Sequence, residues 1–333
     1  MSKKKNKQSN QVVKDMKECF RSFHLPVDDD ISLGKQSFLS QFRTDLLCAN
    51  IDVTHNKKNG YVRIQVIWIL TDPLGRFNEV IKLLDLCNSR LTLDRLSSHP
   101  ERKFVLLETN LFLSDNQLPI GKFNRLIHDI LEHANIGFLL IADVMIGKDP
   151  KDAHASFVDG CNALEEIRKE IPIEAAEIIL KDMESVFHDF GISLSDEDRF
   201  EEGFFVNFAK QKQIVAVKGM VVELFTDGHI VIVELFSSFT IPDAKIDTIT
   251  ESVNWINMRS DVGSMYIRRD DNQVRFRKGI IIENDVLDKM EFKKTVENFI
   301  SSRHLFFDII MTQLITGESP DVIMTKITDK LSK

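Results

Sequence analysis

The second half of the chain repeats the first at a nearly constant offset of 169 residues. Chance similarity between two α/β segments would be confined mainly to apolar positions, whereas here turn residues and polar residues keep the same spacing. We therefore expect two copies of one module. Pairs of identical residues 169 positions apart are Val53 and Val222, Thr71 and Thr240, Pro73 and Pro242, Asn88 and Asn257, Arg90 and Arg259, Val105 and Val274, and Phe123 and Phe292.

A length of 333 residues is enough for two domains, each with its own core. Residues 1–10 contain four lysines and no apolar run follows them, so they are not a secretory signal and are expected to form a disordered basic tail. The repeat then predicts a first module over 11–150, a linking helix over 151–172 and a second module over 173–333.

Composition points to a soluble protein of the cytoplasm. Hydrophobic residues make up 43% and charged residues 28% of the chain. The longest apolar run, 136–146, contains Asp143 and is well short of the ~20 residues that a membrane span needs. The four cysteines are widely separated, which is typical of buried thiols in a reducing compartment, and no histidine pair has the spacing of a metal site. We expect no metal and no cofactor.

The period of the apolar residues changes in the same order in both copies, which predicts an α+β fold. Each copy is expected to contain a helix, a strand hairpin, a second helix, a further strand pair and one or two apolar helices that end at a glycine. The expected segments are 11–24, 45–55, 61–70, 76–89, 103–108, 111–114 and 119–134 in the first copy, and 173–190, 213–225, 229–238, 244–258, 264–269, 273–283 and 288–301 in the second.

Matched glycines and prolines mark the ends of the copies. Gly147 and Gly317 are expected to cap the last apolar helices, and Pro150 and Pro320 stand where a new helix begins. In the first copy this new helix, over about 151–170, has an apolar stripe and links the halves.

Phenylalanine is unusually frequent, with 24 Phe against 2 Tyr and 2 Trp. Several of these residues are adjacent or alternate, so they cannot all face one core. A partner-binding groove is one interpretation of them, and a core or a contact between the two halves is the other, which is the more common arrangement on monomers. The candidates for partner binding are Phe204, Phe205, Phe208, Phe236 and Phe239.

The strand pair near residue 270 carries a basic face that the first copy lacks. Arg268, Arg275 and Arg277 are the candidate binding residues on it, and strand alternation places Arg275 and Arg277 on one face. Such a face suits an acidic peptide, a phosphate-bearing ligand or nucleic acid. The net charge of −8 and the neighbouring Asp270 and Asp271 favour a solvated or internally paired face and disfavour nucleic acid.

Local signatures of catalysis are missing from the sequence, which has no nucleophile elbow, no phosphate-binding loop and no dinucleotide-binding glycine motif. No catalytic residue is therefore predicted. A site assembled across the two halves leaves no local pattern, so a small-molecule-sensing or catalytic protein remains the alternative.

Each copy has a helix that ends in an asparagine, a strand pair after it, and an acidic residue in the next apolar segment. The helix ends are Leu86-Cys87-Asn88 and Trp255-Ile256-Asn257, and the acidic residues are Asp143 and Asp308. In these features the chain resembles the YbjN-like family of bacterial sensory transduction regulators, which share the fold of type III secretion chaperones. Members of the family usually have one module, whereas this chain has two.

The resemblance implies a twisted antiparallel sheet with helices packed on one face, and it supplies no catalytic residues. It implies a protein- or peptide-binding role, chaperone-like or regulatory. Since chaperones of that fold commonly act as two-fold dimers, two linked copies are expected to pair as an intramolecular pseudo-dimer, favoured by an effective concentration of about millimolar or above. Whether the whole chain also forms a homodimer stays open.

Overall fold

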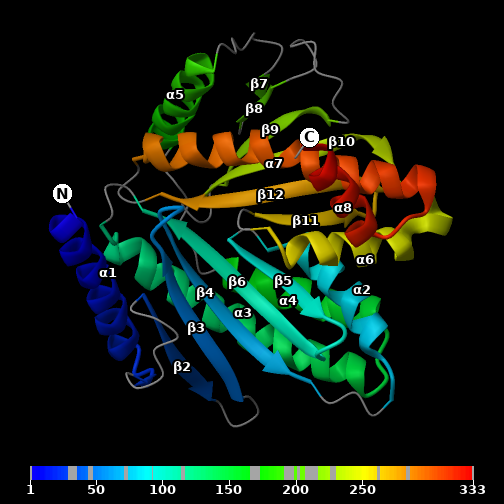
Figure 1. The fold of residues 1–333 in the computed structure, drawn as a ribbon, viewed down its shortest axis with the longest axis horizontal. Helices are drawn as coiled ribbons and strands as arrows, with labels where there is room; N and C mark the ends of the chain where they lie inside the picture. Colours follow the sequence, from blue (N-terminus) through cyan, green and yellow to red (C-terminus); the bar gives the residue numbers. More distant parts are fainter. Residues whose placement is uncertain are drawn as a thin grey trace. The chain divides into compact units, whose positions relative to one another are not determined.

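The computed structural model shows a mixed α+β protein with two antiparallel sheets (Figure 1). This confirms the α+β class expected from the sequence. The residues described by the structure are 2–28, 36–43, 48–70, 74–91, 93–113, 117–165, 173–190, 199–200, 203–206, 217–225, 230–260, 263–282 and 286–331.

The chain divides into two compact units that are not simple halves of the sequence. The first unit contains residues 1–80 and 93–160, and the second contains 81–92 and 161–333. Helix α2 (Phe77–Asn88) therefore begins in the first unit and continues into the second. A second helix, α4 (Pro150–Glu165), contains the other boundary.

The first unit is built on a six-stranded sheet of order β1-β2-β3-β4-β6-β5, in which neighbouring strands are antiparallel. Along β4 the residues alternate between buried and partly exposed, because successive side chains of a strand point to opposite faces. Its strands are β1 (Val27–Asp28), β2 (Ser37–Arg43), β3 (Cys48–Asn56), β4 (Tyr61–Ile69), β5 (Asp94–His99) and β6 (Phe104–Phe112).

Two helices cover one face of this sheet, α1 (Ser2–Ser22) and α3 (Ile120–Met145). The apolar side chains of Val12, Met16 and Phe20, spaced along one face of α1, are buried. The ring of Phe20 packs edge-on against Phe38 of β2 at 5.2 Å between centroids and lies 6.2 Å from Phe123 of α3. These contacts tie both helices to the sheet.

The second unit is built on a six-stranded sheet of order β11-β12-β10-β9-β8-β7, again antiparallel. Read from its other edge, this is the strand order of the first sheet. Its strands are β7 (Arg199–Phe200), β8 (Gly203–Val206), β9 (Val217–Phe225), β10 (Ile230–Thr240), β11 (Ser264–Arg268) and β12 (Gln273–Ile281).

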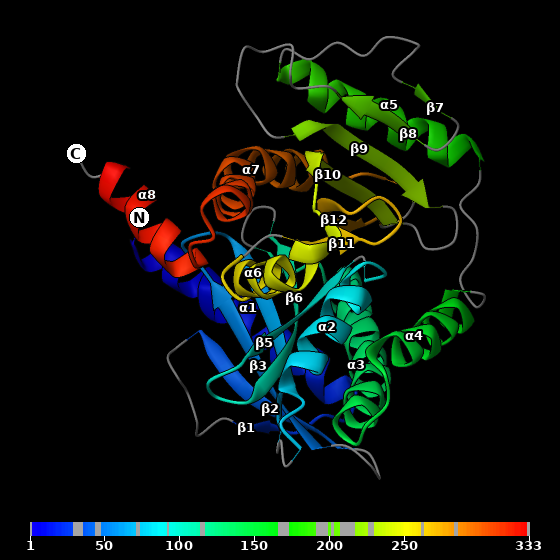
Figure 2. The ribbon, with the colours of Figure 1, turned by 90° about the vertical axis from the view of Figure 1, so that its right-hand side faces the viewer.

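The helices of the second unit occupy the same places in the chain order as those of the first. They are α5 (Ile173–Asp189), α6 (Ile246–Asn257, after the short 3₁₀ turn η3, Asp243–Lys245), α7 (Lys289–Thr316) and α8 (Pro320–Leu331). Helix α7 packs on β10 and contacts α5, α6 and α8 (Figure 2). The ring of Phe187 in α5 meets Phe292 of α7 at 5.8 Å, the counterpart of the Phe20–Phe123 contact.

Central pairings of β3, β4, β5 and β6 recur in β9, β10, β11 and β12 at an offset of 169. Ile64 faces Thr109 and Val233 faces Lys278, Val53 faces Ile64 and Val222 faces Val233, and Arg95 faces Glu108 as Ser264 faces Arg277. Since a shift by one residue would turn every side chain to the other face, this agreement is a strong geometric constraint.

Helix ends follow the matched glycines and prolines. Gly317 adopts a left-handed conformation with φ of 73° at the end of α7, and Gly147 has φ of 125° just after α3. Helices α4 and α8 begin at Pro150 and Pro320.

Three expectations differ from the structure. The strand pair expected at 103–108 and 111–114 is the single strand β6, and its hairpin partner is β5, whose polar sequence lacks strand alternation. Helix α3 is continuous through the two helices expected up to Gly147. Helix α1 begins at Ser2 and so includes the residues expected to form a tail, because Lys, Gln and Asn extend an existing helix at small cost.

Among the described residues, Cys19 and Cys87 are buried and unbridged, as expected. No helix in the described ranges is both long and apolar enough to cross a membrane.

His55 provides a test of the packing in the first unit. It is buried on β3, and neither of its ring nitrogens has a hydrogen-bond partner. Burial, helped by the charge of Lys57, lowers the pKa of His55 below its ordinary value of 6.5. The unfolded chain therefore binds a proton more readily than the folded one, so stability should be complete above about pH 6.5 and fall as the pH drops below it.

We expect His55→Leu to flatten this acid side of the stability curve, measured by urea unfolding between about pH 5 and pH 8. An unchanged pH dependence in the variant would show that the neutral imidazole is not the cause.

Candidate functional site

The predicted binding residues in the described part of the chain lie on strands β8, β10, β11 and β12. Arg275 and Arg277 lie on β12, Arg268 ends β11, Phe204 and Phe205 are neighbours on β8, Phe236 and Phe239 lie on β10, and Phe208 lies outside the described residues. The ring of Phe239 contacts Phe307 of α7 at 6.4 Å. That contact fits the core interpretation of this phenylalanine.

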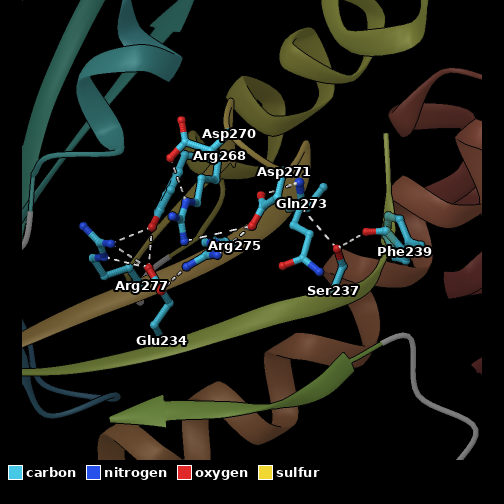
Figure 3. A network of polar contacts seen from close by, with 11 residues as sticks. Glu234, Ser237, Phe239, Arg268, Asp270, Asp271, Gln273, Arg275 and Arg277 are labelled. Atoms are coloured by element: carbon cyan, nitrogen blue, oxygen red, sulfur yellow. Dashed lines mark hydrogen bonds and ion pairs between the residues drawn. The ribbon is translucent and has the colours of Figure 1, made fainter. Parts of the chain in front are cut away.

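The arginines of β12 belong to a buried polar network centred on Glu234 of β10 (Figure 3). Arg275 donates to one carboxylate oxygen of Glu234 at 2.9 Å, and Arg277 donates through Nε to the other at 2.8 Å. Arg277 also donates to the hydroxyl of Tyr266 at 2.6 Å, and that hydroxyl donates to Glu234. Arg275 reaches Asp271 at 2.9 Å as well. The basic face predicted from sequence is therefore internally neutralised at these two positions.

Mutual pairing shifts the protonation equilibria in this network. Burial alone would raise the pKa of Glu234, but Arg277, Tyr266 and Arg275 together hold it below its ordinary value. Burial and the nearby carboxylate raise the pKa of Tyr266 well above its ordinary value. Glu234 is thus a carboxylate and Tyr266 a neutral hydroxyl at neutral pH.

Arg277 also contacts the end of helix α2. Its Nη1 donates to the backbone carbonyl of Ser89 at 2.9 Å. A cation at this place is favourable because the last carbonyls of a helix carry partial negative charge. The network thus fixes the guanidinium that caps α2.

A second contact joins the same helix to β11. Asp85 accepts a hydrogen bond from the backbone N–H of Ile267 at 3.2 Å, and Arg269 donates to its other oxygen at 2.6 Å. Arg269 also lies 3.4 Å from the hydroxyl of Thr250 in α6. Burial raises the pKa of Asp85 to about 6, although Arg269 and the Ile267 amide act to lower it.

The outer edge of β11 is closed by side chains. Asn257, at the end of α6, donates to the carbonyl of Met265 at 2.8 Å and accepts from its N–H at 2.7 Å. With Asp85 on Ile267, three outward backbone groups of this edge strand are paired. Unpaired backbone groups of an edge strand can bind a strand of another chain. Side chains of helices α6 and α2 occupy these groups on β11 and so protect this edge of the sheet.

Arg268 is the most exposed of the predicted arginines. Its Nε lies 3.2 Å from Asp270 and its Nη1 lies 4.0 Å from Asp271, and all three side chains are substantially exposed. Pairs of this kind contribute little to stability, so Arg268 can exchange these partners for an external carboxylate at small cost.

The first unit has a buried ion pair at the same place in its sheet. Arg95 of β5 pairs with Glu108 of β6, which also accepts from Gln65 of β4. Glu108 and Gln65 occupy the positions of Arg277 and Glu234 in the register described above. Both sheets therefore hold a buried ion pair at corresponding positions, although the arginine and the glutamate lie on different strands.

A buried pair between Asp94 of β5 and His133 of α3, 2.6 Å apart, is a further polar contact of the first unit. Within the described residues, no group of three His, Cys, Asp or Glu side chains is placed to hold a metal ion.

Comparison with models of known protein families gives no match, and a search of curated proteins finds none with a similar sequence.

Sequence reasoning missed Glu234, Tyr266 and Asp85 as members of these networks. Asp85 did leave a signal, because it is a single carboxylate within the otherwise apolar run of the second half of α2. Asn257 was predicted only as a helix-end residue. In the structure its side chain pairs with the backbone of Met265 at the outer edge of β11.

We expect Glu234→Gln to destabilise the protein by roughly 3 kcal/mol at neutral pH, because two largely buried arginines lose their shared carboxylate. A carboxylate with a lowered pKa stabilises the fold above its unfolded pKa of about 4.5, and this stabilisation is lost as the pH falls. The difference between wild type and variant, measured by urea unfolding, should therefore shrink in acid. Equal stability at neutral pH would contradict the network.

Asn257→Ala should cost about 2–4 kcal/mol, since it leaves the buried N–H and carbonyl of Met265 unpaired. The matched control is Asn50→Ala on β3, where the side chain is exposed and the change should stay within about 0.5 kcal/mol. Chemical denaturation and hydrogen exchange at the Met265 amide measure both. If exchange at Met265 is unaffected, Asn257 does not protect the edge.

Proposed function

We propose that this chain is a non-enzymatic protein- or peptide-binding protein with a chaperone-like or regulatory role, in which two tandem copies of one module work as a single unit. The resemblance to YbjN-like proteins and to the fold of type III secretion chaperones motivates this role. The antiparallel sheets with helices agree with it at the level of fold class.

The observation that carries the proposal is the placement of residues 81–92. This stretch comes from the first copy in sequence but belongs to the second compact unit. It is held there by Asp85 on Ile267 and Arg269 and by Arg277 on Ser89. A helix that begins in one compact unit and continues in the other supports a proposal in which the two copies work together.

Exposed apolar residues of the first unit are candidates for binding a partner. Ile69, Leu74 and Ile146 expose 76%, 63% and 78% of their surface. Arg76 donates to the carbonyl of Lys148 at 3.2 Å, which brings the chain around Leu74 to the turn that contains Ile146. Exposed apolar groups of this kind are typical of sites that bind another protein.

The three exposed residues give a direct test. We expect the triple variant Ile69→Ser, Leu74→Ser, Ile146→Ser to keep the fold and to lose a stoichiometric protein partner that the tagged wild type captures from its native cytosol. The matched control replaces exposed apolar residues of the second unit, Ile178→Ser and Val286→Ser. Equal capture by all three proteins would remove this surface from the proposal, and no partner with any of them would contradict the binding role.

A further inference from the structure

Besides the hydrogen bond from the Ile267 amide to Asp85, three contacts with charged side chains join the segment 81–92, here called the α2 segment, to the rest of the second unit. Two involve charged partners on both sides and one pairs a guanidinium with a backbone carbonyl. They are Lys82 with Asp247 at 2.8 Å, Asp85 with Arg269 at 2.6 Å, and the Ser89 carbonyl with Arg277 at 2.9 Å.

If each of these residues is replaced by its counterpart in the other copy, the complementary charges are lost. The counterparts of Lys82 and Asp85 are Glu251 and Asn254, and those of Asp247, Arg269 and Arg277 are Asn78, Pro100 and Glu108. The complementary charges therefore occur in one combination of copies.

If two first copies or two second copies paired with each other, each of these attractive contacts would be lost or would become repulsive. Two second copies would place Glu251 opposite Asp247, so that two carboxylates meet. Two first copies would place Asp85, a buried carboxyl, opposite Pro100, and would direct Glu108 at the negative end of the helix. Repulsion of this kind is how proteins distinguish partners of equal shape.

We propose that these three contacts form a charge code that selects the second copy as the partner of the α2 segment and disfavours the pairing of like copies from two chains. This inference rests on the pseudo-dimer of the proposed function. The partner it names is the other half of the same molecule.

Burial of apolar side chains does not distinguish between partners of similar shape, whereas charges do. Leu83, Leu84 and Cys87 of the α2 segment are almost completely buried, which favours docking on any apolar surface of suitable shape. A buried ion pair adds little net stability because both charges lose water, but an unpaired one is strongly unfavourable. Asp85 therefore penalises a wrong partner more than it strengthens the right one.

The buried pair is tested in the full chain by Arg269→Glu against the neighbouring control Arg268→Glu. Arg269 is about one-third exposed, so the substitution leaves the core intact but sets a second carboxylate beside Asp85. We expect a melting temperature lower by about 10 °C at about pH 8 for Arg269→Glu and by less than about 2 °C for Arg268→Glu. At about pH 5 the difference should at least halve, because Asp85 is then protonated.

The exposed pair provides a second test that does not threaten folding. Lys82→Glu and Asp247→Lys should each raise hydrogen exchange at the Ile267 amide by about two- to fivefold, and the double variant should return to the wild-type rate. Equal melting of the two arginine variants, or additive effects in the double variant, would overturn the charge code. The two tests are independent of the capture experiment. If the variants behave as expected but the protein captures no partner, the charge code stands and the proposed binding role is wrong.

Discussion

The attachment of the α2 segment to β11 is the constraint on which the rest of the arrangement depends. A buried carboxyl, Asp85, accepts from the backbone of an edge strand and from Arg269, while Arg277 caps the end of the same helix. Burying a carboxyl is unfavourable unless its oxygens are paired, so the geometry of α2 relative to β11 is narrowly defined. The first residues of α2 belong to the first compact unit and its later residues to the second.

The networks also explain why a strongly basic strand can exist in an acidic protein. Arg275 and Arg277 are adjacent members of one strand face, and unpaired they would repel each other. Glu234 from the neighbouring strand accepts from both, and the Tyr266 hydroxyl and the Ser89 carbonyl also accept from Arg277. The corresponding place in the first sheet holds Arg95 and Glu108. Both sheets thus hold a buried pair of arginine and glutamate at corresponding positions, formed by different residues.

Much of the fold follows from sequence periodicity, and the failures have physical causes. The offset of 169 residues predicted that the same elements recur in the same order. Gly317 and Pro320 predicted where α7 ends and α8 begins, because these residue types have strong backbone preferences. Strand β5 was missed because its residues Asp94, Arg95, Ser97 and Ser98 are polar and are buried by tertiary pairing that no local pattern reveals. Two contacts could not be predicted without knowing the tertiary structure, because their partners are tens of residues apart in the chain. They are the ring contact of Phe239 with Phe307 and the ion pair of Arg277 with Glu234.

The central claim is that the two copies form one cooperative unit through the shared helix. Differential scanning calorimetry of the full chain tests it most directly. The shared helix predicts a single transition whose calorimetric and van't Hoff enthalpies agree, since loss of either unit removes contacts of α2. Two separate transitions, with the first unit melting independently of the second, would contradict the account.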